Sequence, residues 1–204
     1  TRNTFEIAAK RTSANTINVD LANSATKKNE TLMDTMQTLK AMQIDMFVIR
    51  HKESGLPHRI ASNIDGVAII NAGDGTNAHP TQALLDMLTI RQHKGSFDNL
   101  SVAIIGDIRH SRVAHSDIQA LSTLGVKDIR LVAPENLQFN CETPEGVSCF
   151  DNLHEGIESV DVMMTLRLQK ERMMSADIPN EQVYFETFGL TDKKLKLAKP
   201  DAIV

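Results

Sequence analysis

Four groups of cationic and polar residues each follow a short apolar run in this 204-residue sequence. They are Arg50 with His51, residues 71–82, residues 107–112, and Arg167 with Gln169. In open parallel sheets, ligands bind beyond the carboxyl ends of the strands, so these groups predict a binding edge. Arginine holds carboxylate and phosphate groups in a planar, bidentate manner. The pattern therefore predicts an anionic ligand that carries several negative charges.

The sharpest local motif is His79-Pro80-Thr81-Gln82, which stands where a helix is expected to begin. His79 and Gln82 are three residues apart, so both can face one ligand. The positive end of the helix favours an anion and an uncharged imidazole, which would donate a hydrogen bond. The alternative interpretation is that His79 only caps its own helix.

Other charged positions carry less information. Arg167 at a strand end has the alternative of a surface salt bridge, and Lys27-Lys28 the alternative of a solvated pair. Gly106-Asp107 follows a strand as in a dinucleotide-binding motif, but the second and third glycines of that motif are absent. No cysteine or histidine spacing predicts a metal site.

Hydrophobic periodicity predicts alternating helices and strands, with a boundary near residues 76–82. The expected strands are 16–21, 46–49, 67–70, 101–105, 128–132 and 161–166, with a strand-like run at the end of the chain. The expected helices are 3–13, 31–42, 80–95, 111–124 and 191–198, with a helical turn at 170–174. Continuous apolar strands between helices indicate parallel sheets that are covered on both faces.

Composition narrows the function classes. The formal net charge of −4 and the aromatic content of 4% argue against a nucleic-acid partner. No apolar run reaches the roughly 18 residues that a membrane helix needs, and no signal peptide is recognised. We therefore expect a cytoplasmic α/β enzyme or binding module. The first residue is not Met, and we expect the sequence to be part of a longer chain.

Together these residues resemble the catalytic subunits of the aspartate carbamoyltransferase family. The matching segments are residues 1–6, 24–31, 48–51, 71–75 with 79–82, Gly106-Asp107 with Ser111-Arg112 and His115-Ser116, and residues 167–172. Each segment is weak alone, but they occur in the family's order over nearly the whole chain. Only the last two residues of the family's Ser-Thr-Arg-Thr-Arg phosphate loop are present, as Thr1 and Arg2.

The resemblance implies an α/β fold of two lobes, each with a parallel sheet flanked by helices. A partial carbamoyl-phosphate-binding domain would span residues 1–80, and an incomplete aspartate-binding domain residues 81–204. The implied reaction transfers the carbamoyl group of carbamoyl phosphate to the α-amino group of L-aspartate. It yields N-carbamoyl-L-aspartate and phosphate, an early step of pyrimidine biosynthesis, without a cofactor or metal. A homotrimer with shared active sites is implied, and regulatory subunits are compatible with it.

The resemblance also implies a role for each matched residue. The carbamoyl-phosphate contacts would be Thr1, Arg50, His79 and Gln82. Of these, Thr1, Arg50 and His79 would be catalytic, because they would bind the carbonyl oxygen as it becomes an oxyanion. The aspartate contacts would be Arg112, Arg167 and Gln169. Ser24 and Lys28 would belong to a loop that reaches into the neighbouring subunit's site.

Three alternatives remain at this stage. An ornithine carbamoyltransferase shares the logic of the first lobe, but it binds a cationic side chain and has no need of a second arginine. A catalytically inactive paralogue that acts as an assembly subunit would have no use for converging cations. A nucleotide-binding module is disfavoured by the broken glycine pattern.

Overall fold

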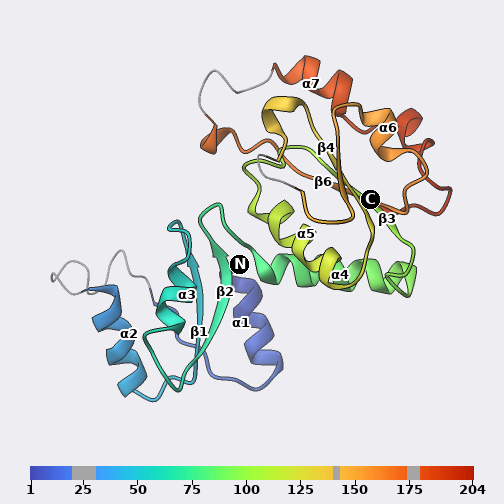
Figure 1. Ribbon diagram of the computed structural model, residues 1–204. Coiled ribbons are helices and arrows are strands. Elements are labelled where there is room, and N and C mark those ends of the chain that lie inside the picture. Colours follow the sequence, from blue (N-terminus) through green and yellow to red (C-terminus); the bar gives the residue numbers. More distant parts are fainter. Residues whose placement is uncertain (20–30, 140–142, 174–179) are drawn as a thin grey trace. The chain divides into compact units, whose positions relative to one another are not determined.

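The computed structural model describes residues 1–19, 31–139, 143–173 and 180–204 (Figure 1). The chain divides into two compact units, Thr1–Gly75 and Thr76–Val204. Each unit contains a parallel sheet with helices packed on it, so the expected α/β fold class is confirmed. Among the described helices, none is long and apolar enough to cross a membrane.

The first unit is built around two parallel strands. These are β1 (Met46–His51) and β2 (Ala68–Asp74), accompanied by α1 (Arg2–Arg11), α2 (Leu32–Ala41) and α3 (Leu56–Ala61). Its core joins Met36 of α2 to Leu56 and Ile60 of α3, with Phe47 and Ile49 of β1 packed against them. Burial alternates along β1, so Arg50 lies on the face opposite this core.

The strand expected at residues 16–21 is wrong for its described part. Residues 14–19 have no regular structure, and Ile17 is 66% exposed. Alternating polarity gives a segment a potential buried face, but a strand also needs a hydrogen-bonding neighbour. Within the described residues, β1 and β2 pair with each other and with no third strand. Residues 20 and 21 lie outside the described part of the chain.

The second unit contains a four-stranded parallel sheet in the order β5-β4-β3-β6. Its strands are β3 (Ser101–Ile105), β4 (Asp128–Val132), β5 (Val147–Phe150) and β6 (Val162–Thr165). Its helices are α4 (Pro80–Lys94), α5 (Arg112–Thr123), α6 (Leu153–Ile157), α7 (Glu181–Phe188) and α8 (Asp192–Leu195), with short 3₁₀ turns η2 (Glu135–Leu137) and η3 (Lys170–Arg172).

The central strand β3 is buried on both faces, as its continuous apolar run predicts. Val102 and Ile104 belong to one core cluster with residues of α4 and α5. Ala103 and Ile105 belong to a second cluster on the opposite face, with residues of α6 and α7. Figure 1 shows α4 and α5 on one side of this sheet and α6 on the other.

The strand order reverses direction at β3. The chain moves outward from β3 to β4 and β5, and then returns to place β6 on the other side of β3. Because β3 and β6 are parallel neighbours, the loops that follow them begin side by side at the carboxyl edge of the sheet, where open parallel sheets bind ligands. The topology puts the predicted ligand edge of this unit at the loops that begin at Gly106 and Leu166.

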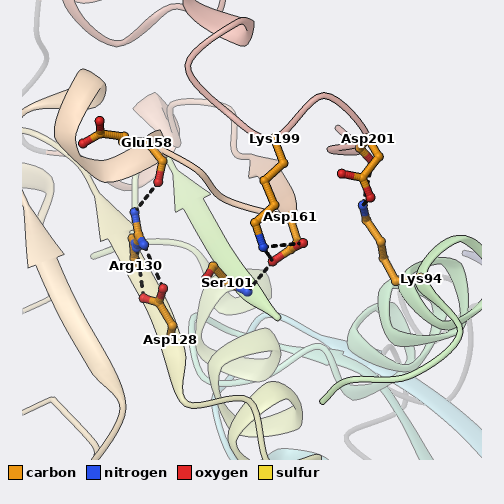
Figure 2. A network of polar contacts seen from close by, with 8 residues as sticks. All are labelled: Lys94, Ser101, Asp128, Arg130, Glu158, Asp161, Lys199 and Asp201. Atoms are coloured by element: carbon orange, nitrogen blue, oxygen red, sulfur yellow. Dashed lines mark hydrogen bonds and ion pairs between the residues drawn. The ribbon is translucent and has the colours of Figure 1, made fainter. Parts of the chain in front are cut away.

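The amino edge of the same sheet carries a network of ion pairs (Figure 2). Lys199 donates to both carboxylate oxygens of Asp161, at 2.9 and 2.8 Å, and the Ser101 amide donates to the same carboxylate at 2.9 Å. Arg130 holds Asp128 through two nitrogens, at 2.9 and 2.8 Å. Lys94 donates to Asp201 at 2.7 Å.

Five elements were not anticipated from the sequence: α3, β5, η2, α6 and α7. Each has eight residues or fewer, which is too short for a clear helical or strand period. The strand-like run at the chain end forms a single bridge, Val162 to Ile203, and no full strand. The other expected helices and strands are present, with ends shifted by a few residues.

Candidate active site

The contribution of the first unit is a contact between Arg50 and Thr1. Arg50 stands near the carboxyl end of β1, and its Nη1 donates to the Thr1 hydroxyl at 3.0 Å and to the Ala72 carbonyl at 3.3 Å. Thr1 is the residue before α1. The fold thus brings together a guanidinium and a hydroxyl that are 49 positions apart in sequence. Both are donors, as binding an anion requires.

The Asn71-Ala72-Gly73-Asp74-Gly75 segment supports this end of the sheet. Asp74 is buried and accepts a hydrogen bond from the Gly55 amide at 2.8 Å, which ties β2 to the loop before α3. Gly75 has a φ of +49°, and a Cβ there would come within 2.2 Å of the Ser54 hydroxyl. The segment therefore has a structural role that its sequence pattern alone did not reveal.

In the second unit, His79 precedes the first residue of α4. Its backbone N–H donates to the Ser116 hydroxyl of α5 at 2.8 Å, so α5 holds the start of α4. The His79 side chain makes no hydrogen bond that caps its own helix, which removes that alternative interpretation. Gln82 lies in the first turn of α4, and its Nε2 donates to Asp86 at 3.0 Å. Thr1 and Arg50 thus belong to one unit, and His79 and Gln82 to the other.

A buried carboxylate, Asp107, links the loops that follow β3 and β6. It is 0% exposed and accepts hydrogen bonds from the backbone amide and Nδ1 of His110, at 3.1 and 2.8 Å. Its other oxygen accepts a hydrogen bond from the backbone amide of Gln169 at 3.0 Å. Arg172 adds a bond to the His110 carbonyl at 2.8 Å. Asp107 therefore joins the loop after β3 to the loop after β6.

Close packing also explains the glycine that precedes Asp107. Gly106 has a φ of +130°, and a Cβ there would lie 2.6 Å from the Leu166 carbonyl oxygen. A side chain would push the two loops apart. Gly106 is thus required by the approach of the two loops, without any need for a nucleotide.

The three predicted aspartate contacts all stand at this edge. Arg112 is the first residue of α5, and Gln169 precedes η3 with its amide on Asp107. Arg167 is two residues beyond β6, with a side chain that is 68% exposed. Its two terminal nitrogens donate to the two carboxylate oxygens of Glu171, at 3.2 and 2.5 Å. This pairing holds the pKa of Glu171 at about 2.

Two predicted residues cannot be placed. Ser24 and Lys28 lie outside the described residues, as does Lys27. In the described ranges, no group of three or more His, Cys, Asp or Glu residues could hold a metal ion. Asp107 and Ser116 stand in the matched segments, but sequence reasoning gave neither of them a role. Asp107 was visible as an acidic residue directly after a buried strand, whereas nothing in the sequence pairs Ser116 with His79.

The chain matches two family domains in succession. Residues 1–92 match the carbamoyl-phosphate-binding domain of aspartate/ornithine carbamoyltransferases, and residues 98–204 match their Asp/Orn-binding domain. Among curated relatives, an aspartate carbamoyltransferase catalytic subunit of Vesicomyosocius okutanii subsp. Calyptogena okutanii is 71% identical over all 204 residues. One from Ruthia magnifica subsp. Calyptogena magnifica is 70% identical. The chain spans 64% of the length of each.

Solved structures agree with these matches. Aspartate transcarbamoylase from Trypanosoma cruzi in complex with carbamoyl aspartate and phosphate has a TM-score of 0.85 and 32% identity. The same enzyme in complex with N-(phosphonacetyl)-L-aspartic acid has a TM-score of 0.86 and 32% identity. Each alignment covers 99% of this chain and 66% of the other. On the two domain matches and the shared fold, this chain belongs to the aspartate/ornithine carbamoyltransferase family.

Proposed function

We propose that this protein transfers the carbamoyl group of carbamoyl phosphate to the α-amino group of L-aspartate. The observation that carries the proposal is the hydrogen bond between Arg50 and Thr1, which gathers anion-binding donors in the half that matches the carbamoyl-phosphate domain. The choice of aspartate is supported by relatives named aspartate carbamoyltransferase at 71% and 70% identity.

The proposed chemistry needs positioning and charge stabilisation, without a nucleophilic side chain. The α-amino group attacks the carbonyl carbon, a tetrahedral intermediate forms, and phosphate leaves with the C–O bond electrons. Thr1, Arg50 and His79 donate hydrogen bonds to the oxygen that becomes negative. Gln82 binds carbamoyl phosphate beside them, and the departing phosphate accepts the proton that the amine loses.

Arg112, Arg167 and Gln169 bind aspartate in this proposal. Arg167 already holds a carboxylate, that of Glu171, through both terminal nitrogens, which is the bidentate geometry that suits a substrate carboxylate. The pair is exposed to solvent on both sides, so a substrate can replace Glu171 at little cost. Asp107 keeps the two loops that carry these residues together.

An assay of the full natural chain with L-aspartate and L-ornithine, side by side, tests the reaction. We expect carbamoyl transfer to aspartate alone, and tight binding of a bisubstrate analogue that joins a phosphonate to an aspartate. Transfer to ornithine would contradict the substrate, and absence of transfer together with weak analogue binding would contradict an enzymatic role.

We also propose a cytoplasmic homotrimer in which Ser24 and Lys28 complete the neighbouring subunit's site. Its support is the family resemblance and the family's shared-site assembly. Trimers of Arg50→Ala alone or of Lys28→Ala alone should be inactive. Trimers mixed at random from the two variants should regain activity at about a quarter of their sites, because one interface in four then carries both intact residues. Inactive mixtures would argue for sites built within one chain.

A further inference from the structure

Two carboxyl groups meet between α4 and α5, away from the residues assigned to aspartate. Asp117 of α5 is 0% exposed, and neither of its oxygens accepts a hydrogen bond from a described residue. Asp86 of α4 is half-buried and interacts with Asp117. Asp86 also accepts the hydrogen bond from Gln82, with 3.0 Å between Nε2 and Oδ1.

Asp86 and Asp117 cannot both be ionised between the two helices, because burial and mutual repulsion both oppose the second negative charge. Burial first, and then the charge of Asp86, raise the pKa of Asp117 from an ordinary 3.8 to about 8. Burial also raises the pKa of Asp86, but hydrogen bonds from Gln82 and Asp117 oppose that shift. At neutral pH the proton therefore resides on Asp117.

Among the described residues, the polar group that interacts with Asp117 is the carboxyl group of Asp86. Asp86 is the one charged side chain in the described part of the chain that acts on Asp117. The neighbouring residues of α5, Ala114, Ile118 and Leu121, are buried and apolar, as are Met87 and Ile90 of α4. A carboxylic O–H directed at Asp86 is thus the hydrogen bond that this site allows.

We propose that Asp117 is a positioning residue that stays protonated, donates a hydrogen bond to Asp86, and thereby orients the side-chain amide of Gln82. An ionised Asp86 only accepts hydrogen bonds, so it must accept one from Nε2 of Gln82. The amide oxygen of Gln82 then points away from Asp86. A protonated Asp86 could donate to that oxygen and reverse the amide. The location of one proton thus decides which end of Gln82 the ligand meets.

The catalytic consequence rests on the proposed function, in which Gln82 binds carbamoyl phosphate. The carbamoyl NH₂ group is a hydrogen-bond donor, and the Gln82 side-chain oxygen, which does not bind Asp86 in this arrangement, is an acceptor. If Gln82 loses this orientation, the binding of carbamoyl phosphate should weaken, whereas the binding of aspartate should stay unchanged.

Asp117→Leu and Asp117→Asn, made in the full natural chain, separate positioning from packing. Leucine cannot donate to Asp86, so the ionised Asp86 carboxylate loses the hydrogen bond that stabilises it and fixes it beside Gln82. We expect KM for carbamoyl phosphate to rise about tenfold, the worth of one hydrogen bond. Asparagine still donates, so it should restore KM to within about twofold of the parent at neutral pH. KM for aspartate should change less than about twofold in both. Asp151→Asn, at an exposed position, is the matched control.

The pH dependence supplies a readout that does not need catalysis. Between about pH 4 and 8 the folded chain keeps a proton that the unfolded chain has released, so the free energy of unfolding falls as pH rises. Asp117→Asn removes this slope, and its melting temperature should rise relative to the parent as pH increases. The parent, unlike Asp117→Asn, should show an infrared band of a protonated carboxyl group at pH 7.

These measurements distinguish the two claims. The positioning role would be overturned by any of three results. These are an absent infrared band, the same pH dependence of stability in the parent and Asp117→Asn, or equal rises in KM for both substrates in Asp117→Leu. A parent chain that shows the band and the slope but transfers no carbamoyl group would reject the proposed function and leave the shared proton intact.

Discussion

The two edges of the four-stranded sheet use charged residues in opposite ways. At the amino edge, the partly buried Asp161 is surrounded by Lys199 and the Ser101 amide, and Lys94, with a side chain only 7% exposed, reaches Asp201 (Figure 2). At the carboxyl edge, the Arg167–Glu171 pair is open to solvent on both sides. The amino edge joins chain segments to one another, whereas the carboxyl edge presents a guanidinium that a ligand can reach.

Exposure, more than the presence of an ion pair, thus separates charges that hold the fold together from charges that a ligand could reach. A shielded pair is costly to open, because its groups would be left without partners. An exposed pair exchanges its partner readily. Asp107 qualifies the contrast, because it lies at the carboxyl edge yet is fully buried and ties two loops together.

His79→Ala should have the largest effect. Removing one donor to a developing oxyanion lowers turnover by about 10²–10³-fold, which we expect to see in kcat of the full natural chain. The backbone bond to Ser116 does not involve the side chain, so the melting temperature should stay near that of the parent. Turnover close to the parent's would remove His79 from the proposed chemistry.

Arg167→Ala should come next. We expect KM for aspartate to rise by about tenfold or more, and KM for carbamoyl phosphate to change much less, because the lost guanidinium would bind the amino-acid substrate. Urea unfolding should be unaffected, since the pair with Glu171 is exposed. An unchanged KM for aspartate would break the contrast between the two edges.

Asp161→Ala tests the opposite edge. The Ser101 amide and the Lys199 ammonium lose their acceptor, and we expect a loss of about 1–3 kcal/mol in the free energy of unfolding, measured with urea. Asp98→Ala, at an exposed position, is the control for removing a carboxylate. Both KM values should match the parent's, and a selective rise in KM for aspartate would show that the amino edge is not purely structural.

Glu171→Gln should have the smallest effect. It replaces the carboxylate that competes for Arg167, so KM for aspartate should fall by about twofold without a change in stability. Because the pKa of Glu171 is about 2, this residue is ionised throughout the assay range, and the effect should be constant from pH 5 to 9. A rise in KM would mean that Glu171 orients Arg167 rather than competing for it.

Local sequence patterns were enough to predict the helix start and the cationic positions. The start of α4 at His79-Pro80 and the cations at or beyond the carboxyl ends of β1, β3 and β6 could be predicted, because a helix cap and a buried strand each leave a short-range signature. Asp107 could be located but its partners could not, since Gln169 joins it from 62 positions away. The Asp86–Asp117 pair has no such signature, because its members lie on different helices.

The amino-acid sequence by itself determined the α/β class and the family, because these follow from residue types and their order along the chain, and it predicted an anion-binding site. Only the tertiary structure decided which charges are shielded and which are accessible. Burial and pairing depend on strand order, as where the loops after β3 and β6 meet, and on helix packing, as between α4 and α5. The same aspartate side chain therefore accepts loop amides at Asp107, an ammonium at Asp161, and a retained proton at Asp117.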